Sequence, residues 1–175
     1  WADWIEFDVS YTLDNQNIIE HGPNLVNTNC WSGKNIKDYT LKYIKDNCKL
    51  KNWEKIMTLE EMLNITKDMF DYYYLEIKVY DTNKAKQQIM DAIATVKKIW
   101  IQDRVIFISY DPTVNYIIWS YSWIVAWRDD YHTWSLEIIQ NFSHPYYLLE
   151  KWYINEDIVN YVNSIGKKLV TYTVN

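Results

Sequence analysis

The sequence Trp4-Ile5-Glu6-Phe7-Asp8-Val9-Ser10 alternates between apolar and polar side chains. As a β-strand, it would present its apolar side chains on one face and Glu6, Asp8 and Ser10 on the other. Two carboxylates held this close repel each other unless a cation or an acid–base task lies between them. The stretch therefore predicts a strand that carries a functional site as well as part of the core.

A second segment, Leu75-Glu76-Ile77-Lys78-Val79, repeats this arrangement with Glu76 and Lys78 on its polar side. Strands that are covered by helices on one side and by a barrel core on the other are normally continuous apolar runs. Two strands that depart from this rule in the same way indicate a polar site inside a barrel. The alternative is a pair of amphipathic antiparallel strands with one solvent-exposed face, since alternation alone is common.

A short hairpin is predicted after the first strand. The residues Asp14-Asn15-Gln16-Asn17 favour a turn, and residues 18–20 would then form a second strand that leads to His21. A hairpin of this length can return His21 to the neighbourhood of Glu6 and Asp8. A lone histidine is more often a surface or capping residue, so only its place beside two carboxylates makes His21 a candidate general acid or base.

The rest of the chain alternates between strands and helices, which is typical of parallel βα units. Main strands are expected at 5–10, 72–79, 104–110, 124–126, 146–149 and 169–174, and helices at 58–68, 83–99, 112–121, 135–142 and 156–164. The predicted fold class is α/β, as one domain over residues 1–175. Because about six of the eight βα units of a (β/α)8 TIM barrel are present, we expect that barrel to be incomplete.

Composition excludes several classes of protein. The net charge is -5 and the only arginines are Arg104 and Arg128, so the chain has no basic surface for nucleic acid. No apolar run reaches the roughly 18 residues of a transmembrane helix. Cys30 and Cys48 have no metal-binding spacing, and two free thiols are favoured over a disulfide. The chain begins like the lead-in to a strand, so we expect the natural N-terminus further upstream. Compartment and oligomeric state are left open.

Five short motifs, in this order, resemble the glycerophosphodiester phosphodiesterase family over nearly the whole chain. The motifs are Ile5–Val9 followed by Thr12–Asp14 and His21, then Glu54–Glu61, Leu75–Lys78, Ile108–Asp111 and Thr171–Asn175. Each alone is weak, but their order and spacing are specific. The resemblance implies hydrolysis of glycerophosphodiesters, which are small molecules, to glycerol 3-phosphate and an alcohol.

Glu6, Asp8 and Glu76 are the predicted metal ligands. Three carboxylates from two strands suit a hard divalent cation, Mg²⁺ or Ca²⁺, and the chain lacks the ligand spacings that are typical of zinc sites. Such a cation would bind a phosphate oxygen and neutralise charge that grows in the transition state.

The resemblance implies that His21 is a catalytic histidine, and Lys78 is expected to hold a phosphate oxygen. Tyr172 and Asn175 are expected to line the substrate pocket. In the family, a second histidine followed by an arginine ends the first strand, and no such pair precedes His21 here, so we expect the chain as given to be inactive or nearly so. The alternatives are a non-catalytic relative that binds phosphodiesters or a protein, and a related phospholipase-type barrel such as a phospholipase D toxin.

Tryptophan and glycine usage is abnormal, with 10 Trp and 3 Gly. Together they make up about 7% of the chain, the usual share of glycine alone. The family has glycine where this chain has Trp1, Trp4 and Trp53, while Trp100 and Trp123 each follow an expected helix, where glycine fits. We hypothesise that most or all ten are glycines in the natural protein, encoded by UGA codons that the organism translates as glycine. The alternative is a tryptophan-rich surface for sugars or a membrane interface.

Overall fold

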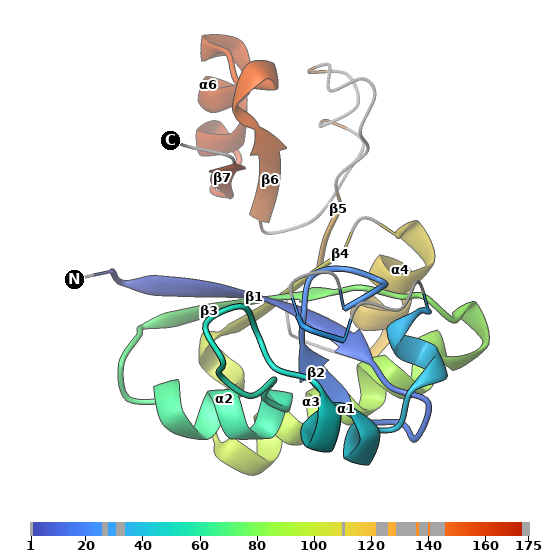
Figure 1. Ribbon diagram of the computed structural model, residues 1–175. Coiled ribbons are helices and arrows are strands. Elements are labelled where there is room, and N and C mark those ends of the chain that lie inside the picture. Colours follow the sequence, from blue (N-terminus) through green and yellow to red (C-terminus); the bar gives the residue numbers. More distant parts are fainter. Residues whose placement is uncertain are drawn as a thin grey trace. The chain divides into compact units, whose positions relative to one another are not determined.

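The computed structural model describes residues 2–172 except 26–27, 31–33, 110, 122–125, 129–135, 137–139 and 141–145. The chain divides into two compact units, residues 1–106 and 107–175 (Figure 1). The boundary passes through one strand, β4.

The first unit is built around β1 (Trp4–Tyr11), the strand predicted from the alternating sequence. β1 pairs antiparallel with β2 and parallel with β3, and the strand order is β2-β1-β3-β4. The other elements are β2 (Asn17–Ile19), η1 (Ile36–Asp38), α1 (Leu41–Asn47), α2 (Leu59–Thr66), β3 (Tyr72–Ile77), η2 (Thr82–Lys84), α3 (Ala85–Ile99), η3 (Gln102–Arg104) and β4 (Val105–Ser109). The predicted hairpin and the predicted parallel strand are both present.

The apolar face of β1 packs toward the helices. Val9 is fully buried, and the hydroxyl of Tyr11 on the same face donates to Asp91 of α3. Figure 1 shows α2 and α3 together on one side of β1 and β3. The helix α3 buries an apolar stripe of four residues, namely Ile89, Ala92, Ile93 and Val96. Burying each isoleucine or valine of this stripe contributes roughly 1.5–3 kcal/mol to the stability of the fold.

The helix α2 begins where its sequence predicts. Thr58 caps it by accepting from the amide of Glu61 at 3.1 Å, and the Glu61 side chain accepts from the amide of Thr58 at 2.8 Å. This reciprocal capping box satisfies amides that have no partner within the helix.

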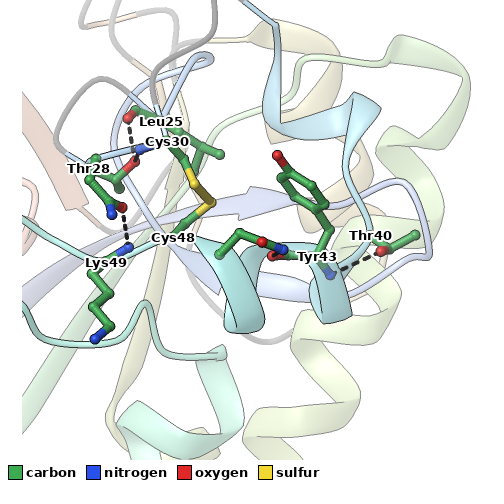
Figure 2. The surroundings of a disulfide bond; sticks show 9 residues. Leu25, Thr28, Cys30, Thr40, Tyr43, Cys48 and Lys49 are labelled. Carbon is green, nitrogen blue, oxygen red and sulfur yellow. Dashed lines mark hydrogen bonds between the residues drawn. A yellow bond between two sulfur atoms is a disulfide. The ribbon is translucent and has the colours of Figure 1, made fainter.

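The two cysteines form a disulfide, so the expectation of free thiols was wrong. Thr28 pairs antiparallel with Leu50, and this register places Cys30 opposite Cys48, with the two Cα atoms 5.1 Å apart. Figure 2 shows the local support: the Thr28 hydroxyl accepts from the amide of Cys30 at 3.0 Å and donates to the carbonyl of Leu25 at 2.7 Å. The disulfide packs in a buried apolar cluster that contains Ile18, Leu25, Ile36, Ile44, Cys48 and Ile56.

The second unit has two parallel strand pairs, β4 with β5 and β6 with β7. Its elements are the end of β4, α4 (Pro112–Tyr121), β5 (Ala126–Arg128), β6 (Tyr146–Glu150), η4 (Lys151–Tyr153), α6 (Glu156–Ser164) and β7 (Lys168–Tyr172). The connection from β6 through α6 to β7 is the predicted βαβ unit, and Gly166 follows α6 with φ +68°. Most of the helix predicted at 135–142 lies outside the described residues.

The structure confirms a mixed α/β fold with parallel strands. The strands of the part that the structure describes do not close into a barrel, so the count of about six of eight units stays a prediction, as does the single domain. None of the described helices is long and apolar enough to cross a membrane.

Two tryptophans have the left-handed backbone that glycine adopts without cost. Trp53 has φ 69° and Trp100 has φ 64°, and their side chains are 73% and 83% exposed. Trp100 directly follows α3, and its amide donates to the carbonyl of Lys97 at 3.1 Å. Glycine is the usual residue at this position after a helix. This geometry supports the glycine hypothesis at these two positions. Trp123 lies outside the described residues.

The variant Trp100→Gly should raise the free energy of unfolding by about 1 kcal/mol, because it removes the clash that a side chain makes in the left-handed region. Urea unfolding followed by circular dichroism measures the change. The control is Tyr72→Gly, since Tyr72 is an exposed aromatic residue in the strand β3, where glycine should cost stability. A Trp100→Gly variant no more stable than the parent would contradict the hypothesis.

Candidate functional site

The polar faces of β1 and β3 bring three carboxylates together. The parallel register pairs Asp8 with Glu76, and alternation along β1 places Glu6 on the same face as Asp8. One oxygen from each of the three carboxylates lies within 4.8 Å of the others, and this is the only such group of potential metal ligands among the described residues. The cluster lies on the face of β1 opposite to Val9 and Tyr11.

Lys78 follows β3 directly and extends its ammonium group into the cluster. Its Nζ lies 3.2 Å from Oδ1 of Asp8 and also forms an ion pair with Glu76. The three side chains are only 11–19% exposed. Burial opposes the charge on Lys78, but the hydrogen bond to Glu76 and the charges of Glu76 and Asp8 outweigh it and raise the pKa of Lys78. One ammonium group therefore faces three carboxylates.

The excess of negative charge changes the protonation of the acids. Burial, followed by repulsion from Asp8 and Glu76, raises the pKa of Glu6 to about 7. Burial also raises the pKa of Glu76, although Lys78 opposes this shift. Glu6 is exposed as a residue, so solvent screens part of the repulsion on its crowded carboxyl group. Near neutral pH, Glu6 therefore holds a proton part of the time. A cation bound by the cluster would relieve the same repulsion between carboxylates.

The donor set fits a hard divalent cation. Carboxylate oxygens are the ligands that Mg²⁺ and Ca²⁺ prefer, and mutual repulsion of the carboxylates is what such an ion would relieve. Glu6, Asp8 and Glu76 could each supply one oxygen, as they are mutually within 4.8 Å.

His21 lies in the bend after β2, and its side chain is exposed. The hairpin returns it toward the cluster, because the amide of the preceding residue, Glu20, donates to the carbonyl of Asp8 at 3.1 Å. Burial raises the pKa of Glu76 overall, and the charge of His21 opposes that shift. Its backbone carbonyl accepts a hydrogen bond of 2.8 Å from the hydroxyl of Tyr80. The structure thus places His21 within electrostatic reach of a candidate ligand, on the segment that the sequence indicated.

The remaining predicted site residues lie in the second unit. Tyr172 is the last residue of β7, and Asn175 lies outside the described residues. Their role in substrate binding stays a prediction.

Two supporting residues were missed by the sequence analysis, Tyr80 and Gln88. Gln88 is 1% exposed, and its Nε2 donates to the carbonyls of Val9 at 3.1 Å and Lys78 at 3.2 Å, which ties β1 to the end of β3. A glutamine within the buried stripe of α3 was the signal that could have found it. Tyr80 had no such signal, because its partner is distant in the sequence.

The fold and the site define an α/β protein with a carboxylate cluster suited to a divalent cation. A model of the glycerophosphoryl diester phosphodiesterase family matches residues 2–175. The chain belongs to this family, whose members are phosphoric diester hydrolases, and the predicted resemblance is confirmed. A search of curated proteins finds no match.

Solved structures show the same fold. A glycerophosphodiester phosphodiesterase from Parabacteroides distasonis is 22% identical, with a TM-score of 0.80 over 97% of this chain and 70% of its own. A putative glycerophosphoryl diester phosphodiesterase from Silicibacter pomeroyi is 17% identical, with a TM-score of 0.84 over 99% and 73%. A phosphodiesterase from Oleispira antarctica, solved with the product sn-glycerol-3-phosphate, is 19% identical, with a TM-score of 0.85 over 99% and 73%. At these identities, the likeness concerns the fold.

Proposed function

We propose that this protein hydrolyses glycerophosphodiesters to glycerol 3-phosphate and an alcohol, with a divalent cation bound by Glu6, Asp8 and Glu76. Family membership supports the reaction, and the product bound to the Oleispira antarctica phosphodiesterase supports the class of substrate. The observation that carries the proposal is the convergence of three carboxylate oxygens, within 4.8 Å, on one face of two parallel strands.

Each residue then has a role that its position supports. A bound Mg²⁺ or Ca²⁺ would polarise a phosphoryl oxygen and offset charge in the transition state. Lys78, beside the same carboxylates, would hold a second phosphate oxygen through its ammonium group. His21, exposed at the edge of the cluster, would exchange a proton with the nucleophile or the leaving group.

We also predict slow turnover. Within the part of the chain that the structure describes, His21 is the one histidine near the carboxylates, whereas two histidines share the proton transfers in the family. His132 and His144 lie outside the described residues. Cation binding and hydrolysis therefore need separate measurements.

The test uses the purified chain with glycerophosphocholine. Release of glycerol 3-phosphate is followed by ³¹P NMR in EDTA, in Mg²⁺ and in Ca²⁺, and cation binding is followed by thermal melting. We expect the phosphomonoester signal to appear only with a divalent cation. Binding of the cation and of glycerophosphocholine without any product would instead favour the non-catalytic alternative. Hydrolysis that is equally fast in EDTA would reject the metal dependence.

A further inference from the structure

Two hydroxyl groups donate to the backbone carbonyls of Glu20 and His21, which lie on either side of the His21 Cα. The Tyr80 hydroxyl donates to the carbonyl of His21 at 2.8 Å. The Ser10 hydroxyl donates to the carbonyl of the preceding residue, Glu20, at 2.6 Å. Two consecutive carbonyls are thus held by side chains from two segments, β1 and the loop after β3.

The two hydroxyls come from β1 and from the loop that directly follows β3, the two strands that carry the carboxylates. Ser10 is fully buried and lies on the same face of β1 as Glu6 and Asp8. Tyr80 lies two residues beyond Lys78. A displacement of the His21 backbone relative to the carboxylates would therefore break these hydrogen bonds.

Further hydrogen bonds tie the segment before His21 and the loop after β3 to β1. The amide of Glu20 donates to the carbonyl of Asp8 at 3.1 Å, and the amide of Lys78 donates to the carbonyl of Val9 at 2.9 Å. The buried side chain of Gln88 bridges the same region of both strands. By contrast, the side chain of His21 is exposed, so packing does little to fix it.

We propose that Tyr80, assisted by Ser10, is a positioning residue that fixes His21 relative to the carboxylate cluster. The inference rests on the proposed function, because it assumes that His21 transfers a proton in the reaction. A neutral hydrogen bond contributes only about 1 kcal/mol to stability. A misplacement of about 1 Å at a reacting group can nevertheless slow the reaction by roughly 100-fold.

The test is Tyr80→Phe in the full chain, which removes one hydroxyl. We expect kcat to fall by roughly 10- to 100-fold, with KM and the cation-induced rise in melting temperature unchanged. Ser10→Ala should act in the same direction. The matched control is Tyr11→Phe, which removes a tyrosine hydroxyl bonded to Asp91 on the opposite face of β1 and should leave kcat unchanged.

A second readout does not need turnover. The Cε1–Hε1 NMR signal of His21, assigned with a His21→Gln variant, should shift in Tyr80→Phe and stay in place in Tyr11→Phe. If the parent protein hydrolyses nothing, the proposed function fails while this spectrum still decides the positioning role. An unmoved His21 signal overturns the inference, and so does an unchanged kcat in an active protein.

Discussion

The double variant Asp8→Asn, Glu76→Gln should lose cation-induced stabilisation entirely and hydrolyse glycerophosphodiesters at least about 1000-fold more slowly than its parent. The two residues face each other across the β1–β3 register and supply two of the three oxygen donors. Amides keep the shape of the side chains but remove the charges that would hold a divalent ion. Several kcal/mol of transition-state stabilisation would be lost with that ion, and each 1.36 kcal/mol is a factor of ten in rate.

The measurements are thermal melts with increasing Mg²⁺ or Ca²⁺ and ³¹P NMR of glycerophosphocholine. The melts decide the binding role even where turnover is slow. Glu60→Gln is the control, because Glu60 forms an exposed ion pair with Lys98 at 2.6 Å on the helical side of the unit. Such pairs contribute about 0–1 kcal/mol, so this variant should match the parent in both assays. A double variant that still binds the cation would exclude the cluster as the metal site.

The carboxylate cluster was predictable because it depends on short-range rules. Alternation along Glu6 and Asp8 and along Glu76 and Lys78 fixes which side chains share a face, and one strand pairing then joins them. The start of the helix at Thr58 and the glycine-like backbone at Trp100 were predictable for the same reason, since each depends on residues within one turn.

The features that were not predicted depend on long-range pairing. Cys30 meets Cys48 only because Thr28 pairs with Leu50 within an irregular segment, and no periodicity in the sequence reports that register. Tyr80 reaches His21 across 59 positions of the chain, with α1, α2 and β3 in between. A hydroxyl that bonds to a backbone carbonyl has no motif, because the acceptor exists at every residue.

Lys78→Met should lower the free energy of unfolding in EDTA by about 3 kcal/mol at pH 8, the lower end of the cost of breaking a buried ion pair by removing one partner. The methionine fills the volume of the lysine stem, so the loss reports the charge. The Lys78 ammonium group forms ion pairs with both Asp8 and Glu76, and the side chains of all three residues are 11–19% exposed. Without it, the buried carboxylates repel each other uncompensated.

The pH dependence separates charge from packing. The pKa of Glu6 is about 7 in the folded protein against 4.5 ordinarily, so between these values the folded state holds a proton that the unfolded chain has lost. The free energy of unfolding therefore falls as pH rises through this window. Lys78 lowers the pKa values of Glu6 and Glu76, so its removal raises both further, and the loss caused by Lys78→Met should be small at pH 5 and complete at pH 8.

Saturating Mg²⁺ or Ca²⁺ should restore most of the stability that Lys78→Met loses, because a divalent ion replaces the missing positive charge, whereas hydrolysis should stay slow without the ammonium on the phosphate. Lys98→Met is the control, since its ion pair with Glu60 is exposed and should change stability by less than about 1 kcal/mol at either pH. An equal loss at pH 5 and pH 8, with no recovery in divalent cation, would show that Lys78 acts through packing of its stem. The cluster would then have no excess of charge for a metal to relieve.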